Sequence, residues 1–323
     1  MVKKVEPLVL TFRKEKFKIE YHFYLCKDSG EKFTTTKLDE INVEQVHSQY
    51  RDKHNLPFIH EIKEIREKYN LSAIKMSQVL GFGPNTYRDY ENGEVPNRSN
   101  GKIIQVAKDP KQFKFLVEIS EALNETQKKK VFARINTLSN VKRSKDYYWE
   151  QLLFSNEQPN IKTGYKEASL DKIREMVVYF ANAIQPMKTM LNKLLFYSDF
   201  LSFRETGYSM SGMEYRAIER GPVPTTFESI FELLDREGVI VISDVKFPNG
   251  FWGKKFSVPT GGAFNQDLFS PQELDVLNAI EKKFKKYNTK KIVNASHEEL
   301  AWLDNHETKS IIDYSYAYYL KHV

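Results

Sequence analysis

The alternation of apolar and polar positions predicts a mainly α fold with small β elements. Phe17 to Leu25 alternate in the manner of a half-buried antiparallel strand, and residues 8–12 form the neighbouring strand. From Ile59 onward, apolar residues recur mostly at three- and four-residue spacing, which is typical of helices with one buried face. A second alternating stretch, 239–258 with a turn at Pro248–Gly250, predicts a β-hairpin within a helical C-terminal half.

The longest ordered pattern covers residues 185–238. It predicts a helix with a broad buried face, then a rigid corner at Gly221–Pro224. Thr225 and Glu228 have the spacing of a capping box that opens a further helix, which ends at Gly238. Ser296 and Glu299 repeat that spacing and predict another helix start.

Residues 72–93 predict two short helices joined by a glycine turn. Ser72 is a suitable N-cap for the first helix, which ends at Gly81. Pro84 suits the first position of the second helix, which covers 85–92 and ends at Gly93. This arrangement is a helix-turn-helix, and ordinary helix packing is the alternative.

In a helix-turn-helix, the start of the second helix enters the major groove of DNA. Asn85, Thr86 and Arg88 are therefore the candidates for contacts with base edges, since Asn reads adenine and Arg reads guanine. The candidates for contacts with the DNA backbone are Ser72, Lys75, Asn92 and Arg98. The alternative for these four is that they are caps and solvated surface residues.

Composition limits the classes of function. The chain has 323 residues, a net charge of +6 and a pI of about 9.0, which permits nucleic-acid binding without requiring it. No apolar run has the length of a membrane span, and the N-terminus lacks the apolar core of a signal peptide, so we expect a cytoplasmic protein. A single cysteine, Cys26, excludes a disulfide within the chain.

The sequence offers no catalytic constellation. His297 lies beside Glu298 and Glu299, but a helix terminus explains these residues without catalysis. Asp199 is a single carboxylate on an apolar helix, and we expect it to accept from a nearby backbone group or to pair with Arg204. We therefore expect no enzyme activity, no cofactor and no metal.

The N-terminal third resembles two families of bacterial regulators. The run Tyr90-Glu91-Asn92-Gly93 resembles Xre-type repressors, and Cys26, Gly30, Glu31 and Phe33 resemble the zinc ribbon of MqsA-type antitoxins. Ser29 replaces the second thiolate of that ribbon, so we expect a degenerate ribbon without metal rather than a site built with His22 or His47. Asn85 matches the asparagine of the MqsA pattern. The arginine of that pattern is Asp89 here, with Arg88 one position earlier, which implies a different operator.

The C-terminal half resembles the Panacea domain, also called the SocA-like antitoxin domain. The resemblance is carried by LNKLLFYSDFLSFRETG at 191–207, SGMEYRAIERGPVPTTF at 211–227 and SHEELAW at 296–302. It implies the antitoxin of a type II toxin–antitoxin pair, which neutralises its toxin by direct contact. Aromatic and arginine side chains anchor such interfaces. The candidates, some of which we expect in the core, are Tyr197, Phe203, Tyr208, Tyr215, Arg216, Arg220, Phe251 and Trp252.

These observations divide the chain into four regions. They are a degenerate zinc-ribbon-like β region (1–50), a helix-turn-helix domain (51–120), connecting helices with a linker near 155–166 (121–160), and a Panacea domain (161–323). The expected protein is a homodimeric antitoxin whose partners are a cognate protein toxin and operator DNA, and which represses its own operon. The alternative is a DNA-binding regulator or proteolysis adaptor whose Panacea-like domain binds another partner.

Overall fold

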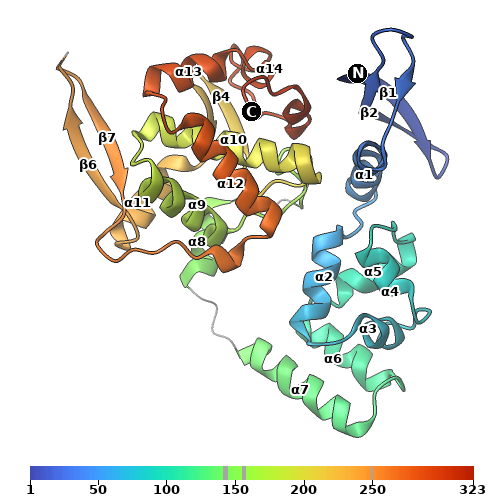
Figure 1. Ribbon diagram of the computed structural model, residues 1–323. Helices are drawn as coiled ribbons and strands as arrows, with labels where there is room; N and C mark the ends of the chain where they lie inside the picture. The colour runs from blue at the N-terminus through green and yellow to red at the C-terminus, as the bar shows by residue number, and fades with distance from the viewer. Residues whose placement is uncertain (141–144, 155–157, 249) are drawn as a thin grey trace. The chain divides into compact units, whose positions relative to one another are not determined.

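The chain forms two compact units, Met1–Ser144 and Lys145–Val323. The computed structural model describes residues 1–140, 145–154, 158–248 and 250–323 (Figure 1). The predicted fold class is confirmed, since helices dominate both units and the strands form only small antiparallel sheets. Residues 155–157 of the predicted linker lie outside the described residues, and 158–166 pack within the C-terminal unit through bonds such as Ser209 N to Gly164 O, 2.9 Å.

The N-terminal unit is a small sheet followed by helices. Its elements are β1 (Val2–Phe12), β2 (Glu15–Leu25), β3 (Lys32–Phe33), α1 (Thr36–Lys53), α2 (Ile59–Lys68), α3 (Ala73–Val79), α4 (Thr86–Glu91), α5 (Arg98–Val106), α6 (Pro110–Ile119) and α7 (Glu125–Asn140).

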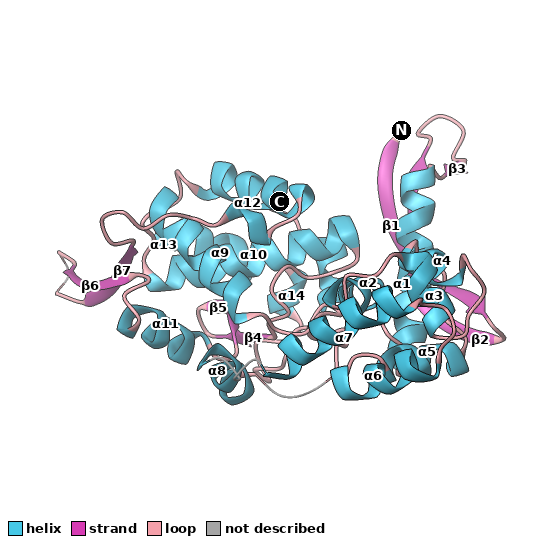
Figure 2. Cartoon of the chain, turned by 90° about the horizontal axis from the view of Figure 1, so that it is seen from below, coloured by secondary structure: helices cyan, strands magenta, loops and turns pink. Residues whose placement is uncertain are grey.

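Helix α1 covers one face of the β1–β2–β3 sheet (Figures 1 and 2). The buried side chains of β2, Phe17 and Ile19, pack with Tyr50 of α1. The amide of Asn42 accepts from the backbone N–H of His22 at 2.8 Å and donates to its carbonyl at 3.0 Å. Because these two bonds satisfy backbone groups of one residue of β2, they fix the helix against the strand.

The helices α2 to α7 of this unit share one hydrophobic core. Tyr69 and Tyr87 are buried in it, and their hydroxyls donate to the carbonyls of Ala107 and Ile62, both at 2.7 Å. The predicted start of the second short helix is wrong by two residues. Helix α4 begins at Thr86 with Asn85 as N-cap, and Pro84 precedes it.

The C-terminal unit is helical with two short hairpins. Its elements are α8 (Lys145–Leu153), α9 (Leu170–Ala183), α10 (Lys188–Thr206), β4 (Tyr215–Ile218), β5 (Gly221–Pro224), α11 (Phe227–Arg236), β6 (Val241–Lys246), β7 (Trp252–Ser257), the 3-10 helix η1 (Gln266–Leu268), α12 (Pro271–Phe284), α13 (Thr289–His297), α14 (Leu300–Leu303) and the 3-10 helix η2 (Tyr314–Tyr319).

Helix α10 is the centre of this unit. Every residue from Met190 to Phe203 is buried, because α9, α12, α13 and η2 surround it together with β5 and β7. Gly207 ends the helix in the left-handed conformation, with φ of +79°.

Two predicted capping boxes are wrong. The N-cap of α11 is Thr226, and no side chain caps it. Ser296 lies inside α13, where its hydroxyl donates to Val293 O at 2.8 Å, and the carboxylate of Glu299 accepts from other parts of the unit instead. Buried partners outside the local segment have therefore replaced the local cap.

The β6–β7 hairpin projects from the unit, as Figure 1 shows. Its base is fixed by Phe256, which is fully buried against Phe231 and whose N–H donates to Pro186 O at 2.9 Å. The hairpin was predicted from alternation and is confirmed, except that Asn249 in its turn lies outside the described residues.

Candidate DNA-binding and partner-binding sites

The second helix of the helix-turn-helix, α4, is fixed by buried contacts on one of its faces. Tyr87 of α4 is completely buried, and burial raises the pKa of its hydroxyl. At the end of α4, the carboxylate of Glu91 accepts from Arg66 Nε of α2 at 2.6 Å. Because these contacts use the inward face of α4, the opposite face is presented to solvent.

The outward face of α4 carries the predicted base-reading residues. Asn85 and Arg88 are exposed one helical turn apart, and Arg88 Nη2 donates to Asn85 Oδ1 at 3.1 Å. Thr86 is half-buried beside Gly83. Asn85 and Arg88 thus lie side by side on the exposed face of α4, where they present hydrogen-bond donors and an acceptor to solvent.

The four residues predicted to contact the DNA backbone differ in the hydrogen bonds that they already make within the protein. Ser72 caps α3 by accepting from Lys75 N at 3.3 Å, and Asn92 is exposed at the end of α4. Lys75 Nζ donates to Ala122 O at 2.9 Å, which ties it to the loop between α6 and α7. Arg98 begins α5, and its Nη2 lies 3.1 Å from His54 Nδ1.

The turn of the β1–β2 hairpin lies against the loop that joins α4 to α5. Arg13 in this turn donates to the carbonyls of Val95 at 2.6 Å and Pro96 at 2.9 Å. The buried Arg51 of α1 donates to Gly93 O at 2.8 Å in the same loop. This contact was not predicted from the sequence. The available signal was the charged run 13–16 between two predicted strands, but nothing local indicates where such a turn docks.

Asp199 is the most enclosed carboxylate of the C-terminal unit. Its Oδ1 accepts from the backbone N–H groups of Met210 and Ser211, both at 2.8 Å, and its Oδ2 accepts from the hydroxyls of Ser211 and Tyr215. Burial raises the pKa of Asp199, and these hydrogen bonds oppose the shift. The expectation that Asp199 bonds to a nearby backbone group is confirmed, and its contacts shape the loop that leads to β4.

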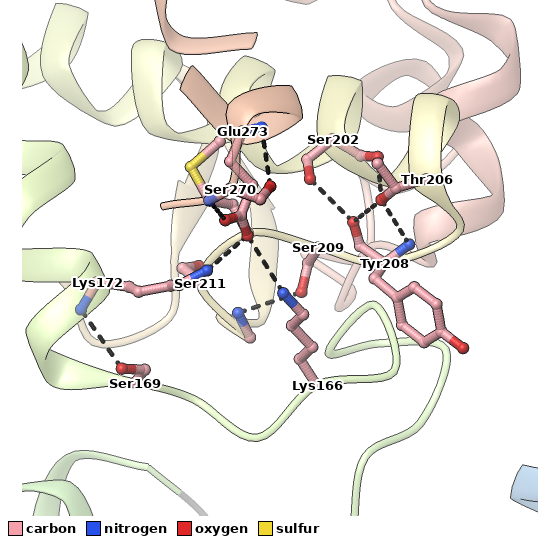
Figure 3. Close-up of polar contacts among 12 residues, drawn as sticks. Lys166, Ser169, Lys172, Ser202, Thr206, Tyr208, Ser209, Ser211, Ser270 and Glu273 are labelled. Atoms are coloured by element: carbon pink, nitrogen blue, oxygen red, sulfur yellow. Dashed lines mark hydrogen bonds and ion pairs between the residues drawn. The ribbon is translucent and has the colours of Figure 1, made fainter. Parts of the chain in front are cut away.

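A second carboxylate holds the start of α12. Glu273 caps α12 together with Ser270, and it accepts from Lys166 at 3.2 Å and Lys172 at 2.6 Å (Figure 3). Burial alone would raise the pKa of Glu273, but the two ammonium groups outweigh it and lower that pKa. The three side chains form a clamp between α9, the segment before it and α12.

The structure separates the predicted toxin-facing residues into two groups. Tyr197, Phe203 and Tyr215 have exposed fractions of 0%, 2% and 0%, so they belong to the core and are removed from the candidate surface. The physical reason is that residues 190–203 of α10 are enclosed on all sides, and that alternate residues of β4, Tyr215 and Ala217, face the core while Arg216 faces solvent. The residues that reach solvent are Tyr208, Arg216, Arg220, Phe251 and Trp252.

Within the described ranges, no group of three or more His, Cys, Asp and Glu side chains is placed to hold a metal ion. In the same part of the chain, no helix has the length and apolarity that a membrane span requires.

Comparison with known families gives two matches. Residues 191–303 match the family described as antitoxin SocA-like, Panacea domain, and residues 62–104 match the helix-turn-helix family. No curated protein and no solved structure matches the chain. The likeness to an MqsA-type ribbon stays a prediction. Each compact unit therefore contains a segment that is similar to a known family: the helix-turn-helix family in the N-terminal unit, and the antitoxin SocA-like Panacea domain in the C-terminal unit.

Proposed function

We propose that this chain is the antitoxin of a type II toxin–antitoxin pair. The C-terminal unit would bind a protein toxin directly, and the helix-turn-helix would repress the operon that encodes both proteins. The observation that carries the proposal is the presence of an antitoxin-type domain and a helix-turn-helix in separate compact units of one chain. Both partners would be met in the cytoplasm.

The role we propose is binding and not catalysis. The buried carboxylates support it, because Asp199 and Glu273 are both saturated by groups of their own unit. Glu299 likewise accepts from Tyr197 at 3.1 Å and from Lys321 N at 2.9 Å. Carboxylates engaged in this way hold the fold together, which supports a role in binding.

For DNA, we propose that α4 enters the major groove with Asn85 and Arg88 at base edges. Asn and Arg side chains can each make two hydrogen bonds to a purine, and here both lie on the solvent face of a helix fixed from behind. A helix of this length reads few base pairs, so we propose that a homodimer binds two half-sites of a palindrome.

For the toxin, we propose the outer part of the β6–β7 hairpin. Phe251 and Trp252 are 72% and 64% exposed, and Lys246 Nζ lies 5.8 Å from the centre of the Trp252 ring. Exposed aromatic side chains on a rigidly based projection are typical anchors of protein interfaces. Arg216 and Arg220 are further candidates on the surface of the same unit.

The N-terminal sheet is, in this proposal, a ribbon that keeps its turn without metal. The turn is closed by backbone bonds from Gly30 N to Cys26 O at 3.1 Å and from Cys26 N to Glu31 O at 3.0 Å. Ser29 occupies the place of the missing thiolate and donates to Glu31 Oε2 at 3.2 Å. Hydrogen bonds thus serve the structural role that zinc has in ribbons of the MqsA type.

The test is co-expression of the chain with the product of the neighbouring gene, followed by affinity pull-down and a growth assay. Rescue of growth together with a stable complex supports the antitoxin proposal and identifies the toxin. If the chain is folded but gives neither result, the antitoxin proposal fails. The alternative would then be a DNA-binding regulator or proteolysis adaptor whose C-terminal unit binds a different protein.

A further inference from the structure

The β1–β2 turn has a conformation that its residues do not favour. Phe12 pairs with Glu15, so Arg13 and Lys14 form a two-residue hairpin loop, and their φ angles are +47° and +69°. Two positive φ angles define a type I′ turn, for which Asn-Gly is the preferred pair. A left-handed conformation is costly for residues with long side chains, so the turn would be more stable with another sequence.

For Arg13, contacts with the rest of the unit explain why an unfavourable residue is present in the turn. Its guanidinium donates to the carbonyls of Val95 and Pro96 and lies 5.2 Å from the centre of the Tyr50 ring. Arg13 therefore clamps the turn to the loop after α4. Lys14 is exposed, and no such contact accounts for it.

Further contacts hold the same end of the hairpin. Glu15 forms an ion pair with Lys53 at 2.8 Å, and its Oε1 lies 2.7 Å from His54 Nε2. The other nitrogen of His54 lies 3.1 Å from Arg98 Nη2, and an arginine only donates. His54 therefore accepts at Nδ1 and donates from Nε2 to Glu15. This chain of bonds joins the hairpin to the first residue of α5.

The loop from Gly93 to Asn97 would face a phosphate ridge in the proposed DNA complex. Helix α4 contains six residues, so it is about 9 Å long, whereas the major groove is about 12 Å wide. Because α4 nearly spans the groove in length, a chain that leaves its end lies close to the backbone that borders the groove. Asn92 and Arg98 flank this loop, and the β1–β2 turn docks on it.

We propose that the β1–β2 turn is a basic wing that binds the phosphate backbone of DNA beside the helix-turn-helix, with Lys14 as its principal contact. Lys16 is exposed two residues further on and adds positive charge to the same end of the hairpin. The wing lengthens the footprint of each subunit beyond what α4 reads. The inference rests on the proposed DNA binding, and it adds a second, sequence-independent contact to it.

The test uses the full-length chain and a short mixed-sequence DNA duplex, because phosphate contacts do not depend on base sequence. Fluorescence anisotropy titrations at several salt concentrations give the affinity and its salt dependence. Lys14→Gly supplies the residue that the turn prefers, so we expect thermal stability equal to or above that of the wild type. We expect its DNA affinity to fall about threefold or more and the slope of log K against log salt to shrink by about 0.9.

Three variants serve as controls. Lys27→Gly removes the same charge from the opposite end of the sheet and should leave affinity and slope unchanged. Lys14→Arg keeps the charge and should retain binding, whereas Lys14→Gln removes the charge but keeps a long side chain and should lose it. A structural role for Lys14 would instead lower the stability of Lys14→Gly.

The outcomes distinguish failure of the wing from failure of the proposed DNA binding by the helix-turn-helix. If the wild type binds the duplex and Lys14→Gly binds with equal affinity and equal salt slope, the wing is wrong and the helix-turn-helix proposal stands. If the folded wild type binds no duplex even at low salt, both proposals fail.

Discussion

At the residue scale, Lys193 is the least expected feature of the C-terminal unit. It lies within α10 with an exposed fraction of 0%, and its Nζ donates to Pro222 O at 2.8 Å. Burial lowers the pKa of Lys193 from its usual 10.5 to about 7. A lysine in such surroundings is neutral over much of the physiological range above that value, because the charged form loses its hydration.

This burial predicts a pH dependence of stability. Between about pH 7 and 10.5, the unfolded chain holds a proton on Lys193 that the folded chain has released, so the free energy of unfolding rises with pH across that interval. The rise is on the order of 3–5 kcal/mol for a shift of this size. Lys193→Met should flatten it, as measured by urea unfolding at several pH values.

The titration of His297 falls outside this interval. Burial and the nearby Lys193 lower the pKa of His297 below 6.5, so its contribution to stability changes at lower pH than that of Lys193. The free energy of unfolding could instead depend on pH in the same way for the wild type and for Lys193→Met between pH 7 and 10. That result would mean that Lys193 is hydrated in the folded protein and that its pKa is not lowered.

Asn85 gives the sharpest test of DNA reading at a single side chain. We expect Asn85→Ala to weaken operator binding by about 1–3 kcal/mol, because a bidentate contact to a base would be lost. It should leave non-specific binding at low salt nearly unchanged. Gel-shift titrations with the region upstream of the gene measure operator binding, and titrations with a mixed-sequence duplex measure non-specific binding.

Asn294 provides a matched control, since it is an exposed asparagine of the C-terminal unit. Asn294→Ala should bind the operator as the wild type does. Unchanged operator affinity for Asn85→Ala, with the protein folded, would rule out the proposed docking of α4.

At the element scale, the outer end of the β6–β7 hairpin carries the prediction for toxin binding. Trp252→Ala should weaken the complex with the toxin by about 2 kcal/mol or more, as is typical of an aromatic anchor. It should not affect stability by more than about 0.5 kcal/mol, because the ring is 64% exposed. Isothermal titration calorimetry and thermal melts give the two quantities.

Phe33→Ala is the comparison for this variant. Phe33 is 43% exposed on the small sheet of the N-terminal unit, so its removal takes away an exposed aromatic ring outside the proposed interface. Toxin affinity should not change. Wild-type affinity in Trp252→Ala would move the proposed interface away from the hairpin, toward Arg216 and Arg220.

The elements themselves were largely predictable from the sequence. Alternation located β2 and the β6–β7 hairpin, and Ser72 caps α3 by short-range chemistry that sequence spacing records. The errors arose where a distant partner competed for a local group. Glu299 has the spacing of a capping residue, but Tyr197 and the backbone of Lys321 engage its carboxylate.

The candidate sites were less predictable, for the same reason. Asn85 and Arg88 were found because a helix places residues three apart on one face. Tyr197 and Tyr215 were misassigned to a surface because enclosure depends on every element that packs around α10. The docking of Arg13 on Val95 and Pro96 joins residues 82 and 83 positions apart, and no local pattern contains that information.

At the scale of the whole molecule, the two compact units predict a separation of functions. If the C-terminal unit alone binds the toxin, a fragment of residues 145–323 should rescue cells that express the toxin. The fragment retains the contacts of α10, α12 and the β6–β7 hairpin, all of which lie within this unit. The growth assay with the full chain and with the fragment measures the difference.

The complementary fragment completes the experiment. Residues 1–144 contain the helix-turn-helix and the sheet that docks on it, so this fragment should bind the operator and should not rescue growth. Circular dichroism must first establish that both fragments fold, because an unfolded fragment says nothing about the site. If 145–323 is folded and the cells still die, toxin binding needs residues of the N-terminal unit. Toxin binding and operator binding would then both use residues of the N-terminal unit.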